Sequence, residues 1–185
     1  MPWSMHEDSD PVFMNSKKAN AAMVRQRDSL ILISKNPKDT FCIGKTLGES
    51  LTGGDCVALM GELGAGKTCL TQGIAAGLGV PDGYVVTSPT FTLINEYPGK
   101  KTSLYHFDVY RLTGSMDLEE MGYQEYLMGD GVVVIEWAEK VSDVIPDEAL
   151  RVELTYMDEN TRKIEISGCP DRICSWKRTY QQGGC

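Results

Sequence analysis

The segment Gly61–Thr68, which reads GELGAGKT, fits the pattern G-x-x-x-x-G-K-[S/T] without a mismatch. It follows the uninterrupted apolar run Cys56–Met60, which is typical of a central strand covered on both faces. It precedes a segment with apolar residues at every fourth position, namely Leu70, Ile74 and Leu78. A buried strand, a glycine-rich loop and a helix are therefore predicted in direct succession, which is the context this motif requires. Such a chain is constrained to the α/β class.

The chemistry of this loop is that of a phosphate cradle. Its glycines let the backbone curl so that N–H groups point inward, and the following helix directs its positive end at the same anion. Lys67 adds a positive charge for the β- and γ-phosphates, and the Thr68 hydroxyl suits a Mg²⁺ ligand. A purely structural turn would not need Lys-Thr directly after Gly66. The segment Gly61–Thr68 is therefore predicted to bind a nucleotide.

Two acidic residues at strand ends are candidates to face the cradle, because phosphate hydrolysis or transfer needs a carboxylate there for Mg²⁺. The run VVVIEW reaches Glu136, although Glu replaces the more common Asp, and LYHFDVYR reaches Asp108. Each has an alternative interpretation. Glu136 could cap a neighbouring helix. Asp108 could face solvent on an alternating strand, since the other face is taken by Tyr105, Phe107 and Val109.

Three further features near these acids leave two interpretations open. The segment Thr87–Thr90, TSPT, places hydroxyls beside a rigid bend. It is either a switch that contacts γ-phosphate or metal, or ordinary turn chemistry. Trp137 either stacks on a ligand or partner, or fills the core. His106 shares the face of Asp108 and is either catalytic or a hydrogen-bonded strand residue.

The rest of the pattern predicts a mixture of strands and helices. Asn36 and Pro37 are suited to the N-cap and first position of a helix. A helix over Ser115–Met128 is expected to have Ser115 as its N-cap. The other expected elements are a strand over Leu30–Ile33, an antiparallel hairpin from Phe91 to Val109, a buried strand over Val132–Ile135, and a second hairpin pairing Arg151–Tyr156 with Lys163–Ser167.

The chain is predicted to hold one domain within its 185 residues. Residues 1–28 are expected to be a disordered N-terminal extension and residues 29–168 the folded domain. Residues 169–185 show no clear period and are expected to form a C-terminal tail that carries Cys169, Cys174 and Cys185.

The composition argues against unaided binding of nucleic acid. The formal net charge is -8 with no long Lys/Arg run, whereas such proteins usually present a basic face to phosphates. No apolar run approaches the ~20 residues needed to cross a bilayer, and no secretory signal is indicated. The six cysteines contain no C-x-x-C pair and are expected to be reduced thiols. We therefore expect a cytoplasmic protein without a membrane partner.

The sequence lacks the motifs that define several other classes of nucleotide-binding protein. The guanine-reading N-K-x-D motif is absent, because NPKD at Asn36 precedes the cradle. There is no Arg-rich lid of the small-molecule kinase kind and no Ser-Gly-Gly signature of transporter ATPases. What remains is GELGAGKT, SPTFTLINEY, YHFDVYRL, GYQEYL and VVVIEW, in that order. Together these five segments resemble the bacterial TsaE (YjeE) ATPases, over about residues 30–167.

This resemblance implies a three-layer α/β P-loop NTPase fold with a mixed central sheet and antiparallel hairpins. It implies an ATPase, weak alone, that uses ATP and Mg²⁺ in building threonylcarbamoyladenosine (t6A) at position 37 of tRNAs. The partners would be TsaD, which transfers the threonylcarbamoyl group, and TsaB, a scaffold. Contact with tRNA would be made only through these partners.

The resemblance also assigns roles to residues. Lys67, Asp108 and Glu136 would be catalytic, and Thr68 and Glu136 would ligate Mg²⁺. The nucleotide would be bound by the loop residues Gly61, Leu63, Gly64, Ala65, Gly66, Lys67 and Thr68, and by Thr40, Thr90, Trp137 and Arg162, with Thr40 and Arg162 near the adenine. The long N-terminal extension and the Cys-bearing tail are not explained by the family pattern.

Binding and hydrolysis of the nucleotide are thus expected to reset the conformation of a tRNA-modifying partner, without transfer of phosphate to a small molecule. Two alternatives remain. One is a P-loop kinase acting on a small molecule, and the other is a nucleotide-dependent binding module that never hydrolyses. Phosphate release from ATP, with and without partners, discriminates among the three.

Overall fold

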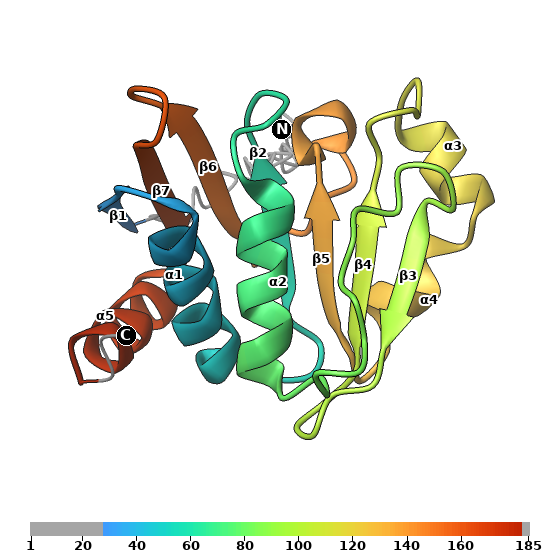
Figure 1. Ribbon diagram of the computed structural model, residues 1–185. Coiled ribbons are helices and arrows are strands. Elements are labelled where there is room, and N and C mark those ends of the chain that lie inside the picture. The colour runs from blue at the N-terminus through green and yellow to red at the C-terminus, as the bar shows by residue number, and fades with distance from the viewer. Residues whose placement is uncertain (1–27, 183–185) are drawn as a thin grey trace, which may run out of the picture.

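A seven-stranded sheet forms the centre of the computed structural model, which describes residues 28–182. The strand order is β1-β7-β6-β2-β5-β4-β3 (Figure 1). The predicted extension, apart from Asp28, and Cys185 lie outside the described residues. The elements are β1 (Asp28–Ser34), α1 (Pro37–Ser50), β2 (Cys56–Met60), α2 (Lys67–Leu78), β3 (Ile94–Tyr97), β4 (Leu104–Asp108), α3 (Ser115–Glu120), α4 (Tyr123–Leu127), β5 (Val132–Glu136), the 3-10 helix η1 (Ala138–Val141), β6 (Leu150–Tyr156), β7 (Arg162–Gly168) and α5 (Pro170–Gln182).

The direction of the strands brings the candidate site together. The four neighbours β4, β5, β2 and β6 run parallel, whereas β3, β7 and β1 pair antiparallel to their neighbours. The carboxyl ends of the four parallel strands therefore meet at one edge of the sheet, where ligands bind in open α/β folds. The phosphate-loop motif follows β2 at this edge, and Asp108 and Glu136 end β4 and β5.

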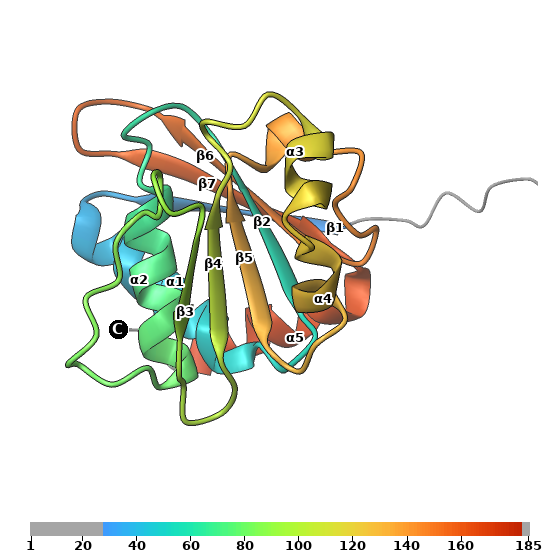
Figure 2. The same cartoon turned by 90° about the vertical axis from the view of Figure 1, so that its right-hand side faces the viewer.

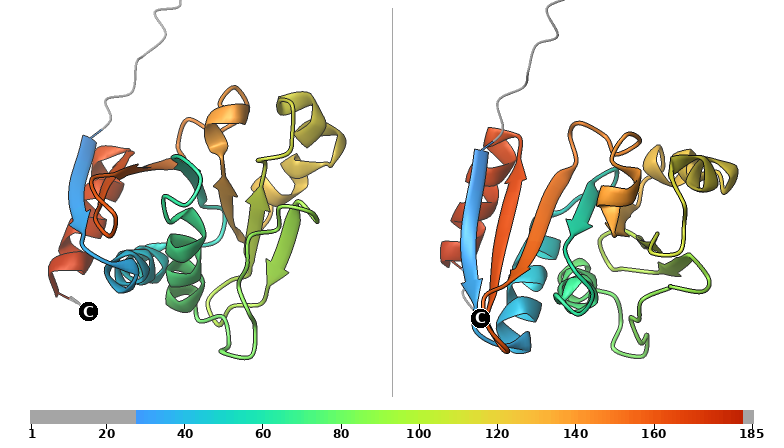
Figure 3. Two further views of the ribbon diagram at one scale, coloured as in Figure 1. Left: turned by 45° about the horizontal axis from the view of Figure 1, so that its top comes forward. Right: turned by 90° about the horizontal axis from the view of Figure 1, so that it is seen from above.

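The helices cover the sheet in two layers, so the predicted three-layer α/β fold with a mixed sheet and antiparallel hairpins is confirmed (Figures 2 and 3). One core lies between the sheet and α1, α2 and α5, and includes Leu47, Leu70 and Trp176. The other core lies beneath α3, α4 and η1 and includes Phe107 and Ile135. No helix within residues 28–182 is long and apolar enough to span a bilayer.

Helices α1 and α2 pack with their backbones in contact through four glycines, Gly44, Gly48, Gly73 and Gly77. A Cβ atom on Gly73 would lie 2.1 Å from the carbonyl oxygen of Phe41, and one on Gly44 would lie 2.2 Å from that of Leu70. Such separations are far inside van der Waals contact, so a side chain at these positions would force the helices apart. The helix that follows the phosphate loop is thereby held close to α1.

The predicted elements β1, α1, β2, α2, β5, β6 and β7 are present. Asn36 caps α1 as expected, since its side chain accepts a hydrogen bond from the backbone N–H of Asp39 at 3.0 Å. The first hairpin is shorter than predicted, because β3 begins at Ile94 rather than at Phe91. Leu93 has a φ of 65°, which turns the chain just before the strand, and Phe91 is exposed.

The single helix predicted over Ser115–Met128 is wrong. Two short helices, α3 and α4, are separated at Met121 and Gly122. Gly122 has a φ of 71°, in the left-handed region that ends a helix and that glycine adopts without strain. Ser115 lies inside α3 after the cap residue Gly114, and its hydroxyl donates to Asp143 at 2.7 Å.

The segment predicted as an aperiodic tail contains a helix, α5. Ile173 and Trp176 are buried against the sheet and α1, and the guanidinium of Arg172 forms a two-point ion pair with the carboxylate of Asp55. Ile173, Trp176 and Tyr180 recur at helical spacing and form one apolar face, while polar residues occupy most of the other positions, so the description of this segment as aperiodic is wrong. Packing against the core, rather than local pattern, stabilises this helix.

Candidate functional site

A pocket of about 380 Å³ opens at the carboxyl edge of the sheet. Its size is within the range of small-molecule sites. The phosphate loop, the start of α2, the loop between α2 and β3, and the ends of β4 and β5 all contribute to it. Its walls are formed by Leu63, Gly64, Gly66, Lys67, Thr68, Cys69, Ser88, Thr90, Asp108, Tyr110, Glu136 and Trp137.

The glycines of the loop adopt the conformation that the motif predicts. Gly61, Gly64 and Gly66 have φ angles of 134°, 76° and 108°, which residues with a Cβ rarely adopt. Gly66 is the N-cap of α2, and no side chain caps this helix end. The first-turn amides and the positive end of the helix dipole are therefore directed at the loop, an arrangement that favours an anion.

Lys67 is buried within this loop, with 4% of its surface exposed. Its Nζ donates to the carbonyl oxygens of Gly61 at 2.7 Å and Glu62 at 2.9 Å, and lies 3.6 Å from the centroid of the Trp137 ring. Burial lowers the pKa of Lys67, and the negative charge of Glu136 partly offsets this shift. The ammonium therefore lies at the pocket wall, in contact with carbonyl oxygens and an aromatic face.

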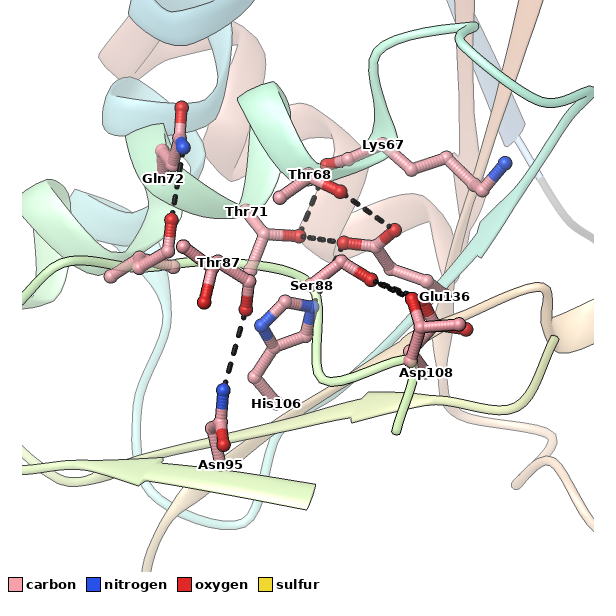
Figure 4. Close-up of polar contacts among 12 residues, drawn as sticks. Lys67, Thr68, Thr71, Gln72, Thr87, Ser88, Asn95, His106, Asp108 and Glu136 are labelled. Carbon is pink, nitrogen blue, oxygen red and sulfur yellow. Dashed lines mark hydrogen bonds and ion pairs between the residues drawn. The ribbon is translucent and has the colours of Figure 1, made fainter. Parts of the chain in front are cut away.

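Glu136 lies directly beneath the first turn of α2 (Figure 4). Its Oε2 accepts a hydrogen bond from the Thr68 hydroxyl at 3.0 Å. Its Oε1 lies 2.8 Å from Nε2 of His106 and accepts a hydrogen bond from Thr71 at 3.4 Å. The carboxylate thus contacts side chains rather than serving as a simple end cap, and it joins the start of α2 to β4 and β5.

Asp108 is 2% exposed, so the alternative of a solvent-facing strand residue is wrong. The segment that carries Ser88 and Thr90 covers it, and both hydroxyls donate to Oδ2, Thr90 at 2.9 Å. Oδ1 accepts from the backbone N–H of Tyr110 at 2.9 Å. The TSPT segment is therefore tied to the end of β4, which goes beyond turn chemistry.

Trp137 forms part of the pocket wall directly after Glu136. Its φ of 65° is left-handed, an uncommon conformation for a bulky residue, and it turns the indole toward Lys67 and Tyr110. The rings of Trp137 and Tyr110 have centroids 4.8 Å apart. The ring thus lines the pocket and also packs against the edge of the core beneath α3, α4 and η1, and stacking on a ligand stays a prediction.

A second pocket of about 230 Å³ adjoins the other side of the phosphate loop, and Thr40 and Arg162 both line it. The Thr40 hydroxyl is 2.7 Å from that of Ser34, and the Arg162 guanidinium stacks on Tyr156 at 4.0 Å. The structure therefore brings together the two residues predicted near the adenine, although they come from α1 and β7.

Sequence reasoning missed two residues that support the site. The Tyr156 hydroxyl, at the end of β6, donates to the carbonyl oxygen of Leu63 at 2.9 Å and so holds the loop. Thr71 contacts Glu136 from the second turn of α2. Tyr156 ends the predicted strand Arg151–Tyr156, but the pairing of that strand with β2 is seen only in the structure. Thr71 lies beyond the phosphate-loop motif and carries no distinct signal in the sequence.

The oxygen donors at this edge fit a magnesium ion that shares its coordination with phosphate. Within residues 28–182 no group of three or more His, Cys, Asp or Glu side chains could hold a metal alone. Mg²⁺ is commonly bound by one or two carboxylates together with substrate phosphates. Thr68 Oγ1 and Glu136 Oε2 are 3.0 Å apart, close to the ~3.0 Å between adjacent ligands of an octahedral ion with bonds of ~2.1 Å.

Comparison with known proteins identifies the family. The family model described as "Threonylcarbamoyl adenosine biosynthesis protein TsaE" matches residues 34–164. The protein of Treponema pallidum (strain Nichols) named "tRNA threonylcarbamoyladenosine biosynthesis protein TsaE" is 42% identical over 135 residues, which cover 73% of this chain and 98% of the relative. The protein of the same name from Bacillus subtilis (strain 168) is 39% identical over 137 residues, covering 74% and 84%.

A solved structure agrees with these relatives. The crystal structure of Bacillus subtilis YdiB aligns with a TM-score of 0.71 at 32% identity, over 85% of this chain and 97% of that chain. The matched region contains the phosphate loop, both buried carboxylates and the whole parallel part of the sheet. This chain therefore belongs to the TsaE family.

Proposed function

We propose that this chain is the ATPase subunit of the machinery that forms threonylcarbamoyladenosine at position 37 of tRNAs. It would bind and hydrolyse ATP with Mg²⁺ and so drive the cycling of TsaB and TsaD partners. The observation that carries the proposal is the pocket in which Lys67 and Thr68 of the phosphate loop face two buried carboxylates, Asp108 and Glu136. Relatives named for threonylcarbamoyladenosine biosynthesis support the pathway.

In this proposal the loop binds the triphosphate through its amides and the positive end of α2. Lys67 exchanges its two carbonyl contacts, to Gly61 and Glu62, for phosphate oxygens and neutralises charge that develops on the γ-phosphoryl group. Thr68 and Glu136 would hold the magnesium ion, which would supply positive charge to offset the negative charge of the triphosphate. The base would lie toward Thr40 and Arg162, in the second pocket.

Asp108 is proposed to position the attacking water. Its Oδ2 is occupied by the hydroxyls of Ser88 and Thr90, so the carboxylate and the TSPT segment are coupled. Contact of these hydroxyls with the γ-phosphate would free Oδ2 to accept a hydrogen bond from water. The conformation of the TSPT segment would then depend on the bound nucleotide, and a partner that contacts this segment beside the pocket could respond to the difference.

The net charge of the chain is consistent with ATP being bound by this subunit and tRNA by its partners. A formal net charge of -8 disfavours direct binding of tRNA, so TsaB and TsaD partners would hold the RNA. We place the reaction in the cytoplasm, where thiols stay reduced. Cys56, Cys69, Cys169 and Cys174 are free thiols.

Phosphate release from ATP tests the function, measured for the chain alone and with TsaB and TsaD added. We expect slow release alone, faster release with both partners, and loss of release when EDTA removes Mg²⁺. A phosphorylated metabolite in place of free phosphate would indicate a small-molecule kinase. ATP binding without any turnover, even with the partners, would indicate a binding module.

Asp108→Asn is expected to lower partner-stimulated phosphate release by about 100-fold while ATP affinity changes less than about threefold. The amide retains the shape of the side chain, but it is uncharged and cannot take up a proton as the carboxylate can. Stopped assays of phosphate release, together with calorimetry of ATP binding, separate the two effects. Asp82→Asn, on an exposed loop, is the matched control. Unchanged turnover in Asp108→Asn would contradict the assigned role.

A further inference from the structure

Glu136 is longer by one methylene than the aspartate that more often serves as the metal carboxylate in P-loop proteins. The extra rotatable bond must be fixed before one oxygen can face Thr68 reliably. We propose that His106 is a positioning residue that fixes the Glu136 carboxylate, so that Oε1 is held within the protein and Oε2 is presented to the pocket. This inference rests on the proposed function, because it concerns the same site.

The contacts between the two side chains are short and shielded from water. His106 is 0% exposed and the Glu136 side chain 3%. On the adjacent strands β4 and β5, His106 pairs with Val134, two residues before Glu136, so all three side chains project from the same face. His106 Nε2 lies 2.8 Å from Oε1, whereas Thr71 is 3.4 Å away. His106 is therefore the closer of the two partners on Oε1.

The two nitrogens of the His106 ring have different surroundings. Among the described residues, Nδ1 of His106 is buried and has no hydrogen-bond partner. The carboxylate oxygen beside Nε2 is an acceptor, so Nε2 carries a proton and is the donor in this contact. His106 thus acts as a donor to Oε1. His106 is then the main partner of Oε1, because the single proton of the Thr71 hydroxyl also faces the closer carbonyl oxygen of Lys67, at 3.0 Å. Oε2 is the oxygen near Thr68.

A role in packing alone would not require an imidazole here. A buried nitrogen without a partner destabilises the folded protein, and an apolar side chain of similar size would avoid that cost. The imidazole offers, in exchange, a directed N–H toward Glu136. Hydrogen bonds that orient a metal ligand typically change metal affinity by about 10–100-fold. The effect of His106 should therefore be visible in magnesium dependence.

The matched variants His106→Gln and His106→Asn test the inference. A Gln amide can place its N–H near the position of Nε2, whereas the shorter Asn amide reaches only the position of Nδ1. Calorimetry with a non-hydrolysable ATP analogue, over a series of Mg²⁺ concentrations and in EDTA, measures binding without turnover. Mg²⁺ is expected to increase the affinity for the ATP analogue. For His106→Asn, the Mg²⁺ concentration that produces half of this increase should rise about 10-fold. His106→Gln should stay within about threefold of the unmodified protein, with binding in EDTA alike for all three.

A double-mutant cycle shows whether His106 acts through Glu136. With Glu136→Ala as background, His106→Asn should cause no further change in magnesium dependence. Thermal unfolding of each variant identifies any loss of folded protein, and the Gln and Asn pair can be compared at equal folded concentration. Equal magnesium dependence in Gln and Asn, or an undiminished effect of His106→Asn in the Glu136→Ala background, would overturn the role of His106.

The same measurements separate this inference from the proposed function. Unmodified protein that binds no ATP analogue with Mg²⁺ would overturn both. Unmodified protein that binds it, together with an Asn variant of unchanged magnesium dependence, would overturn the role of His106 alone. If His106→Asn lowered the affinity for the ATP analogue equally with Mg²⁺ and in EDTA, the role of His106 would likewise be overturned. The histidine would then support the pocket as a whole rather than the metal carboxylate.

Discussion

Replacing Lys67 by alanine is expected to lower partner-stimulated ATP turnover by about a thousandfold. Preorganised charges that face the developing charge of a transition state are among the largest single contributions to catalysis, at about 100–1,000-fold for one neutral donor. Lys67 supplies a full positive charge in a buried setting, where its field is weakly screened. Phosphate release measured with saturating ATP and both partners would report the loss.

This variant should nevertheless fold. The ammonium of Lys67 is desolvated, which lowers its pKa, and removing it relieves that penalty even as two hydrogen bonds to loop carbonyls are lost. Lys45→Ala, on the exposed surface of α1, is the matched control and should retain turnover. Normal turnover in Lys67→Ala, with the partners present, would show that the catalytic assignment is wrong.

Gly73→Ala is expected to destabilise the protein by about 3 kcal/mol, the upper end of the usual effect of overpacking. The new methyl group would lie 2.1 Å from the carbonyl oxygen of Phe41, and backbone atoms cannot swing aside as a flexible side chain can. Alanine gains about 1 kcal/mol over glycine in helix propensity, and the steric conflict outweighs this gain. Thermal or urea unfolding monitored by circular dichroism measures the difference.

The consequence would extend to the nucleotide site. α2 starts at Lys67, and α1 carries Thr40, so separating the two helices would shift both ends of the predicted binding region. Gly83→Ala is the control, since no atom lies within 4 Å of a Cβ there. It should leave stability unchanged or slightly raised. A Gly73→Ala protein as stable as the unmodified chain would contradict the close packing of α1 and α2.

The elements predicted best are those whose signal lies within a few consecutive residues. Cys56–Met60 is uniformly apolar, the phosphate loop is a contiguous motif, and Asn36 with Pro37 marks a helix start. The elements that were missed depend on distant partners. α5 is stabilised by burial of Trp176 and by the ion pair of Arg172 with Asp55, which lies more than a hundred residues earlier in the sequence.

Glycine also limited what the pattern could predict. The helix expected through Ser115–Met128 is interrupted because Gly122 takes a left-handed conformation, which a period of apolar residues does not reveal. Gly44 and Gly73 read from the sequence as weak helix formers, yet the structure uses their missing side chains for close packing. The same residue type can thus end a helix or hold two helices together, and the neighbouring backbone decides which.

By itself, the sequence determined the strand–loop–helix unit with its phosphate-binding chemistry and the two acidic strand ends, because these depend on residue types at fixed local spacing. Only the tertiary structure decided that Asp108 is buried, that Thr68 and Glu136 share a hydrogen bond, and that His106 contacts the same carboxylate. Those outcomes arise from the parallel pairing of β4, β5 and β2 beneath α2. Strand order and the face that a helix covers are set by the burial of apolar surface over the whole chain, and no short segment encodes that balance.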